Sequence, residues 1–366
     1  MTSYGRSVVE TTFSLIEAIE HQAESCARIG SPLYASLLSG LAGDYLSGGL
    51  TAELLEDVSE RPLHDAVPLR YLATAHRLAL AGAAPELAAS FPSCGGRWTG
   101  GDITDVFLSV VALHRGEFAR GVLRNVQTNE VGRAAVLAAG FSAVADRTDH
   151  GLRTLELGGS AGLLSHWDRF GFSTGESSAG DPTSPLQFGP EWYRRPPPHL
   201  HHGIRIVERG SVDVSPIDVS TDDGRTSMLS FVWPDQIERF QRLDQAIEIA
   251  RLHPLHVDAA DAGDWLTQKL GDGHLDGHLD GVATVVFHSI VWQYLAADTK
   301  SSIRSALASA GARSTPAAPV YWLRMEPATQ EHADLRLTTW NASSPVGTEE
   351  LLAHVGYHGA DVDWCG

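Results

Sequence analysis

The sequence has little cysteine and no long uninterrupted apolar run. Its 366 residues include three cysteines, which are far apart and show no CxxC spacing. This pattern excludes a disulfide framework and a cysteine zinc site, and it is typical of a reducing cytoplasm. The first residues lack the apolar core of a signal peptide, and polar residues interrupt the longest apolar stretch, residues 282–297. We therefore expect a cytoplasmic protein without a membrane span.

Positive charge is scarce as well. Lys and Arg number 27 against 45 Asp and Glu, which gives a formal net charge of −18, and Arg194 and Arg195 are the only adjacent basic pair. Such a chain repels a phosphate backbone and an anionic membrane surface. We therefore expect a small-molecule substrate, and neither nucleic acid nor a membrane as a partner.

Several catalytic signatures are missing. The P-loop and the kinase motifs do not occur, which excludes the commonest phosphoryl-transfer classes. No HExxH or comparable spacing occurs either. His199, His201 and His202 lie in a proline-rich segment without a carboxylate at a recognised interval, so we expect no metal site.

Apolar spacing divides the chain into two parts. Hydrophobic residues make up 43% of the sequence, and up to about residue 149 they recur at helical spacing. Afterwards, short strand-like runs alternate with helical segments. Strands alternating with helices form a mainly parallel sheet covered on both faces. We predict an α/β protein with a helical cap domain, residues 1–149, and a sheet domain, residues 150–366.

The sheet domain contains six strand-like runs. They lie at residues 152–157, 204–207, 255–259, 282–290, 320–323 and 335–340. A long insertion at about residues 173–202 separates the first two runs, and its three consecutive prolines favour an extended segment. A tandem GHLD at residues 273–280 is expected to form a solvated loop.

A glycine-rich stretch follows the first of these runs. In LRTLELGGSAGLLSHWDRF, residues 152–170, a buried strand leads into a turn at residues 158–162, and Leu163, Leu164 and Trp167 then resume helical spacing. Glycines allow positive φ and close ligand approach, and the first N–H groups of a helix attract polar or anionic groups. The stretch therefore predicts either a nucleotide-type site or a turn with no ligand.

Polar residues follow three other predicted strands. Asp213 is placed to bind ribose hydroxyls, because a carboxylate accepts two hydrogen bonds from a vicinal diol; otherwise it forms a turn. Asp261 is placed either to bind an adenine amino group or to cap a helix. His288 and Ser289 end the most apolar strand, where His288 is either a general base or a structural histidine.

The segment VQTNEVGR, residues 126–133, is rich in polar groups for the border between the two parts. Its Thr or Asn could cap the last helix of the first part, with Glu130 in the first turn. The polar side chains of Gln127, Asn129, Glu130 and Arg133 could instead face a pocket. The two interpretations are compatible.

The order of these features resembles that of class I S-adenosylmethionine-dependent methyltransferases. The first motif of that family has an acidic residue and three alternating glycines, which Glu156, Gly158 and Gly162 match, whereas Ser160 replaces the middle glycine. Asp213 and Asp261 fall where the ribose and adenine contacts of that family lie. The strand-like runs at residues 335–340 and 361–364 resemble its terminal antiparallel hairpin. The resemblance implies a Rossmann-like sheet that binds S-adenosylmethionine.

The whole chain also resembles a bacterial family known as domain of unknown function 2332. The resemblance rests on SPLYASLL, FPSCGG, VQTNEVGR, ELGGSAGL, VWPDQ and WLRMEP, which are spread over nearly the full length. This family implies no reaction.

Our leading hypothesis is a small-molecule methyltransferase-like enzyme. Glu156, Gly158, Gly159, Ser160, Gly162, Asp213 and Asp261 would hold S-adenosylmethionine, Gln127, Asn129, Arg133 and Ser289 would bind the substrate, and His288 or Glu130 would be the catalytic base. Two alternatives stay open. One is a non-catalytic module that binds a nucleoside-like ligand on the same fold, and the other is an acid/base enzyme that uses no cofactor.

Overall fold

The computed structural model describes residues 13–271, 281–341 and 344–365. The GHLD repeat lies outside this range. The chain forms two compact units, residues 1–128 with 226–240 and residues 129–225 with 241–366. The expected boundary at residue 149 stays a prediction, but the helix that precedes it belongs to the second unit.

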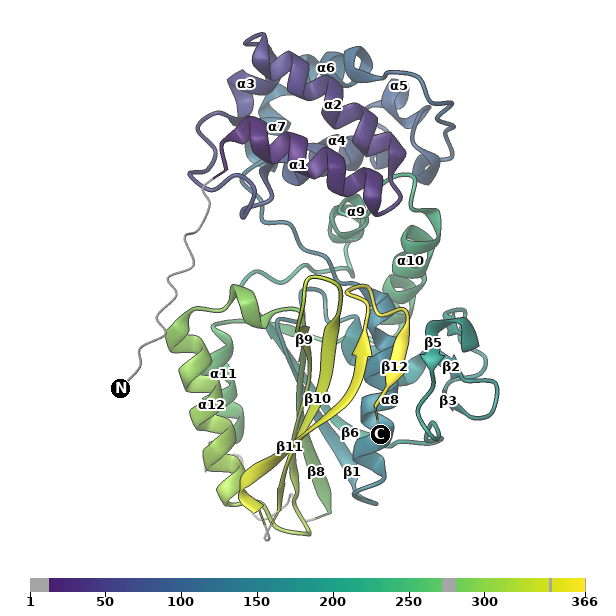
Figure 1. The fold of residues 1–366 in the computed structure, drawn as a ribbon, viewed down its shortest axis with the longest axis vertical. Coiled ribbons are helices and arrows are strands. Elements are labelled where there is room, and N and C mark those ends of the chain that lie inside the picture. Colours follow the sequence, from purple (N-terminus) through teal and green to yellow (C-terminus); the bar gives the residue numbers. More distant parts are fainter. Residues whose placement is uncertain (1–12, 272–280, 342–343, 366) are drawn as a thin grey trace. The chain divides into compact units, whose positions relative to one another are not determined.

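The first unit is helical, as expected. Its helices are α1 (Leu15–Arg28), α2 (Pro32–Leu46), α3 (Leu50–Leu55), α4 (Val67–Leu80), α5 (Pro85–Ala88), α6 (Thr104–Leu113) and α7 (Arg115–Gly121). Local sequence fixes where they begin: Ser14 closes a capping box on α1, and Ser31 caps α2 with Pro32 in its first turn. Helices α1 and α2 lie side by side (Figure 1).

Three of the motifs quoted above meet in this unit. Asp235 of VWPDQ accepts hydrogen bonds from the Ser31 hydroxyl at 2.6 Å and from the Leu33 amide at 3.0 Å. The amide of Ser93, in FPSCGG, donates to the Pro234 carbonyl at 2.9 Å. The buried His76 lies between the Ser230 carbonyl, 3.1 Å from Nδ1, and the Ser93 hydroxyl, 2.7 Å from Nε2. Burial lowers the pKa of His76 to about 4, so this histidine is neutral near pH 7 and serves packing together with Ser93 and Ser230.

The second unit contains a nine-stranded sheet of order β5-β12-β11-β10-β9-β8-β1-β6-β7. The strands are β1 (Gly151–Leu157), β5 (Tyr193–Arg195), β6 (Ile206–Asp213), β7 (Val257–Ala259), β8 (Val282–Ser289), β9 (Val320–Pro327), β10 (Ala333–Asn341), β11 (Ser344–Val355) and β12 (Val362–Trp364). Strands β7, β6, β1, β8 and β9 are parallel to one another. Strands β10, β11 and β12 continue the sheet in antiparallel fashion. The α/β prediction is confirmed.

Two local expectations were wrong. We expected the runs at residues 335–340 and 361–364, which are β10 and β12, to pair as a hairpin. Both pair instead with β11, a strand that we did not expect. The sequence of β11 hides it, because SPVGTEELLAHV combines proline, glycine and glutamates, which are all rare in strands. After the glycine turn, the chain forms the short 3₁₀ helix η3 (Leu164–Arg169) rather than an α-helix.

Helices cover both faces of the sheet, as expected. On one face lies α8 (Ala134–Ala145), which is buried along its length and follows the 3₁₀ helix η2 (Val131–Arg133). On the other face lie α11 (Ala262–Leu270) and α12 (Ala297–Ala312), whose apolar side chains share one core with β1 and β8 (Figure 1). Helices α9 (Asp222–Ser230) and α10 (Ile237–Leu252) each begin in one unit and end in the other.

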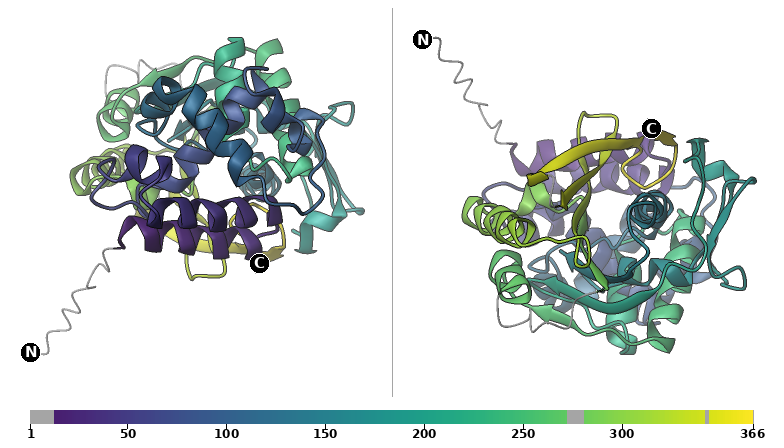
Figure 2. Two further views of the ribbon diagram at one scale, coloured as in Figure 1. Left: turned by 90° about the horizontal axis from the view of Figure 1, so that it is seen from above. Right: turned by 90° about the horizontal axis from the view of Figure 1, so that it is seen from below.

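The insertion between β1 and β6 covers α8. It forms β2 (Gly171–Ser173), β3 (Ser178–Gly180) and β4 (Gln187–Phe188), which make a small separate sheet, and the edge strand β5. Figure 2, right, shows α8 between this insertion and the large sheet. The Tyr193 hydroxyl donates to the Ala135 carbonyl, and Phe141 stacks on Trp167. In the described part of the chain, no helix has the length and apolar character needed to cross a bilayer.

The aromatic contacts of α8 predict a large effect of one substitution. The ring of Phe141 lies 4.4 Å from that of Trp167 and 5.4 Å from that of Phe287, measured between centroids. Phe141→Ala should therefore lower the free energy of unfolding by about 3–5 kcal/mol. Urea denaturation followed by tryptophan fluorescence measures this loss. Leu252→Ala, at a side chain that is 76% exposed, is the control and should change it by less than about 0.5 kcal/mol. Equal midpoints for the two variants would contradict the packing described here.

Candidate functional site

The carboxyl ends of β1 and β8 mark the candidate site. In the parallel series β7-β6-β1-β8-β9, the strands that follow β1 along the chain, β6 and β7, lie on one side of it. Strand β8 and its successor β9 lie on the other side, so the strand order reverses between β1 and β8. Open α/β sheets bind ligands outside the carboxyl ends of their strands at this switch point. Most of the candidate site residues of the sequence lie at or beside the carboxyl ends of the parallel strands.

The glycine turn after β1 curls over the end of β6. Its backbone has positive φ at Gly158 (70°), Ser160 (54°) and Gly162 (71°). A Cβ at Gly158 would lie 2.3 Å from Cγ2 of Val291. At Gly159 a Cβ would lie 2.0 Å from the Ser211 hydroxyl oxygen. The protein's own packing therefore requires these two glycines, and Ser160 adopts the left-handed conformation that a glycine would supply.

The N–H groups of this turn bond mostly within the protein. Gly158 and Gly159 both donate to the Val212 carbonyl, at 2.8 and 3.0 Å. Three others donate to acceptors nearby: Ser160 to Asp213, Gly162 to the Gly159 carbonyl and Leu163 to Asn129. The turn thus does not present a row of N–H groups to an anion, unlike a typical phosphate-binding loop.

Glu156 is buried on the side of β1 that faces η3. Its Oε2 accepts hydrogen bonds from the Ser165 hydroxyl at 2.6 Å and from the Ser211 hydroxyl at 3.3 Å. Burial raises the pKa of Glu156 to about 7, although both hydroxyl bonds favour the charged form. Glu156 therefore links β1, β6 and η3 beneath the turn.

Asp213 ends β6 beside the turn. One of its oxygens, Oδ2, accepts from the Ser160 amide, and the other, Oδ1, accepts from the Ser215 amide, both at 2.9 Å. A carboxylate has about four acceptor positions, so each oxygen keeps one lone pair. The turn-forming role and the ribose-binding role foreseen for this residue are compatible.

The segment VQTNEVGR joins the two strand ends. Asn129 Oδ1 accepts from the Leu163 amide at 2.9 Å. Arg133 donates through Nη1 to the Ser289 carbonyl at 3.2 Å and through Nε to the Tyr357 carbonyl at 3.1 Å. Asn129 is thus tied to the glycine turn and Arg133 to the end of β8. Gln127 belongs to the helical unit, and its role as a substrate ligand stays a prediction.

Glu130 caps η2 and also contacts a histidine. Its Oε1 accepts from the Gly132 amide at 3.3 Å, and its Oε2 lies 3.0 Å from Nδ1 of His358. His358 was not among the residues that we singled out. Its contact with Glu130 spans 228 positions in the sequence, so no local pattern could have indicated it.

His288 forms a pair with Glu326. Nδ1 of His288 lies 2.6 Å from Oε1 of Glu326, and Trp292 stacks on the imidazole at 5.4 Å. Because a carboxylate only accepts, Nδ1 carries the proton, and Nε2 of the neutral ring is an acceptor. That Nε2 is buried and has no hydrogen-bond partner among the described residues. Sequence reasoning missed Glu326, although WLRMEP contains it at the end of the strand next to β8.

The same glutamate holds a strained turn. Ile290 has φ of 52°, which is rare for a β-branched residue and costs about 1–3 kcal/mol. Oε1 of Glu326 also accepts from the amides of Val291 at 3.1 Å and Trp292 at 3.2 Å. These bonds keep the turn in its strained form. The turn directs the chain after β8 toward the glycine turn.

Asp261 follows β7 and comes directly after Ala260, whose amide donates to the Asp213 carbonyl at 3.1 Å. It caps α11 by accepting from the Gly263 amide at 2.8 Å, and it accepts from the Thr299 hydroxyl at 2.5 Å. Its helix-capping role is therefore confirmed, whereas its role as an adenine ligand stays a prediction.

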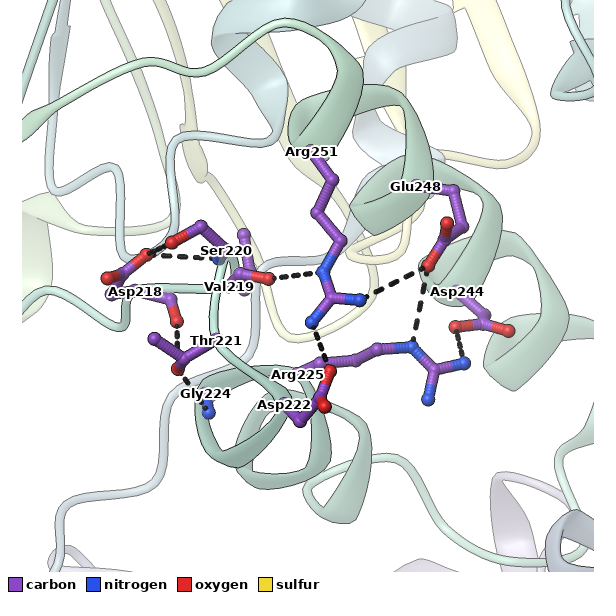
Figure 3. Close-up of polar contacts among 10 residues, drawn as sticks. All are labelled: Asp218, Val219, Ser220, Thr221, Asp222, Gly224, Arg225, Asp244, Glu248 and Arg251. Carbon is purple, nitrogen blue, oxygen red and sulfur yellow. Dashed lines mark hydrogen bonds and ion pairs between the residues drawn. The ribbon is translucent and has the colours of Figure 1, made fainter.

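The segment that follows Asp213 is held by ion pairs. Asp218 accepts from the amide and the hydroxyl of Ser220 (Figure 3). Arg251 of α10 donates to the Val219 carbonyl and to Asp222, both at 2.8 Å. Arg225 pairs with Asp244 at 2.5 Å. Asp218 thus forms a turn like that of Asp213, within a network that joins residues 218–225 to α10.

The chain belongs to a bacterial family without an assigned function. Residues 16–364 match the family described as "uncharacterized protein conserved in bacteria (DUF2332)". Comparisons with curated proteins and with solved structures return no match. The family resemblance inferred from the motifs is thereby confirmed, whereas the methyltransferase resemblance stays a prediction.

The raised pKa of Glu156 predicts a specific pH dependence. Between about pH 4.5 and 7 the folded protein keeps a proton that the unfolded chain has released, so stability falls as pH rises through this window. Glu156→Gln removes this titration. Relative to the variant, the wild type should lose about 2–3 kcal/mol between pH 5 and pH 8.

Urea denaturation of both proteins at the two pH values measures the change. Glu331→Gln, at an exposed position, removes the same charge and is the control, for which the difference from wild type should stay nearly constant. A pH-independent difference for Glu156→Gln would show that Glu156 is charged throughout.

Proposed function

We propose that the second unit binds S-adenosylmethionine at the carboxyl ends of β1 and β6, and that the protein is a methyltransferase-like enzyme for a small molecule. The observation that carries this proposal is the strand order. In the parallel series, β7-β6-β1-β8-β9 corresponds to the third, second, first, fourth and fifth strands, which is the order 3-2-1-4-5 of doubly wound nucleotide-binding sheets. The glycine turn follows the first strand, and an acidic residue ends the second.

The hydrogen bonds of the turn indicate the kind of nucleoside. Because five N–H groups of residues 158–163 bond inside the protein, a diphosphate lacks the donors that usually hold it. Asp213 instead offers a lone pair on each oxygen, which suits a ribose diol. A ligand without phosphates that carries a positive charge fits an acidic site, and S-adenosylmethionine has both properties.

The acceptor side of the site has one buried base. When bound, S-adenosylmethionine supplies an electrophilic methyl group on a sulfonium. Nε2 of His288 is an acceptor, since Nδ1 donates to Glu326, so it can take the proton of an acceptor hydroxyl or amine. The carboxylate of Glu326 would stabilise the imidazolium that results. Arg133 and Asn129 hold the end of β8 and the glycine turn in place for both ligands.

A second candidate function rests on the same histidine. The pair of His288 and Glu326, with the strained turn at Ile290, needs no cofactor to act as an acid and a base. It favours acid/base chemistry on a small polar substrate. In that case neither methyl donor nor its product would bind, which separates the two proposals. A non-catalytic module would bind both compounds and turn over no acceptor.

The test is calorimetric titration with S-adenosylmethionine and with S-adenosylhomocysteine. We expect micromolar affinity for the wild type. Asp213→Asn should weaken binding by roughly 10–100-fold, since a hydrogen bond to a charged group contributes about 1.5–3 kcal/mol. The matched control is Asp218→Asn, which alters a similar aspartate turn five residues further on and should leave the affinity unchanged.

Absence of heat and of thermal stabilisation with either compound would overturn the proposal. Binding that Asp213→Asn leaves unchanged would overturn the location at the end of β6. Far-ultraviolet circular dichroism of both variants checks that they are folded.

A further inference from the structure

Two histidines of the insertion and an aspartate of α8 form a cluster apart from the candidate site. Nε2 of His199 lies 2.7 Å from Oδ1 of Asp146, and Nε2 of His201 lies 2.6 Å from the same oxygen. We propose that these three side chains bind a divalent transition-metal ion, with Zn²⁺ as the best match. This goes beyond the proposed function and does not depend on it.

The donor set and its geometry suit zinc. Two imidazole nitrogens and one carboxylate oxygen are common zinc ligands, with bond lengths of about 2.0–2.2 Å and tetrahedral geometry. Ligand atoms around such an ion are about 3.3 Å apart. Oδ1 of Asp146 therefore needs to move only roughly 0.6 Å away from the two Nε2 atoms, which now lie 2.7 and 2.6 Å from it. The two Nε2 atoms lie within 4.8 Å of each other. All three side chains are partly exposed, so an ion can enter and water can complete its coordination.

The backbone holds the two histidines in place. Leu200, between them, is buried, and its amide donates to the Ser177 hydroxyl at 2.9 Å. The amide of His201 donates to the Ser142 hydroxyl at 3.0 Å. Ser142 and Asp146 are four residues apart on α8 and so share one face. One face of the helix thus supplies the ligand Asp146 and also Ser142, which holds the backbone of the ligand His201. Because the ligands are already ordered, less conformational entropy is lost when the ion binds.

The charges around the cluster favour a cation. Asp146 is the C-cap of α8, where the helix dipole is negative. No described arginine or lysine pairs with it, because His199 and His201 are its only ion-pair partners among the described residues. A second cluster, His332, Asp334 and His354, differs in this respect. There Nη2 of Arg336 lies 2.8 Å from Oδ2 of Asp334, so a guanidinium already occupies the carboxylate.

A metal ion at Asp146 would pin the insertion to α8. Helix α8 has 12 residues and a length of about 18 Å. Asp146 therefore lies at the opposite end of α8 from Arg133, which contacts the end of β8. The ion would stabilise the polyproline segment on the helix rather than take part in chemistry at the strand ends. We expected no metal site from the sequence, because no carboxylate lies at a recognised interval from these histidines. Asp146 is 53 and 55 positions away from them.

The experiment uses the full chain without a polyhistidine tag, stripped of metal by chelation and dialysis. Titration with Zn²⁺ is followed by calorimetry and by thermal unfolding. We expect one Zn²⁺ per chain at micromolar affinity or tighter, with a higher unfolding temperature. Co²⁺ should give the visible absorption bands of a site with nitrogen and oxygen ligands.

Asp146→Asn is the main variant, because its amide oxygen can still accept from both histidines while its charge is lost. It should lower the affinity by more than about 100-fold, since even an outer-shell change costs 10–100-fold. His201→Gln should have the same effect. The controls are His202→Gln, one residue further on, and the double variant His332→Gln with His354→Gln, and both should bind as the wild type does.

The proposal would be supported by stoichiometric Zn²⁺ binding that is lost in Asp146→Asn and His201→Gln and retained in the control variants. Absence of stoichiometric binding would overturn it, and so would binding that Asp146→Asn leaves intact or that is lost only in the double variant.

Discussion

The contact between the glycine turn and the end of β6 holds the strand ends of the sheet together. Two N–H groups of the turn bond to one carbonyl of β6, and a third bonds to Asp213. To reach them the backbone must curl, which requires left-handed residues at alternate positions. The same turn contacts Val291 after β8 so closely that Gly158 cannot carry a side chain. A change in the turn would therefore move the ends of β6 and β8 as well.

Local sequence predicted the elements whose signals lie within a few residues. Ser31 and Pro32 mark the beginning of α2, and the apolar runs of β1 and β8 are strands because both faces of the sheet are covered. Strand β11 was not predicted, because its pairing with β10, and not its own composition, makes it a strand. The 3₁₀ helix η3 escaped because Leu164 and Trp167 satisfy the spacing of an α-helix, whereas the bond from Ser165 to Glu156 depends on tertiary structure.

The position of the candidate site in the sheet was predictable from the sequence, whereas the side-chain pairs that form in it were not. The rule that parallel strands end at one edge brought Asp213, His288 and the glycine turn to the same region. Which side chains touch there depends on contacts over long separations, such as His288 with Glu326 over 38 positions and Glu130 with His358 over 228. Asp146 with His199 and His201 is a third case. Residue type and spacing carry no information about such pairs.

Carboxylate side chains stabilise turns and helix starts in both units. Asp235 accepts from the Leu33 amide, Glu326 from the amides of Val291 and Trp292, and Asp213 from those of Ser160 and Ser215. In each case a carboxylate satisfies N–H groups of a turn or helix start that the backbone alone leaves unpaired.

This use explains why several quoted motifs pair an acid with a turn: VWPDQ meets SPLYASLL, and WLRMEP meets the end of β8. An acid that already holds a turn rigid is also well placed to bind a ligand beside that turn, because a carboxylate keeps acceptor positions after accepting two N–H groups. Structure and binding are therefore not exclusive roles for Asp213. Substituting it should be judged by ligand affinity and stability together, against Asp218, which holds a similar turn five residues further on.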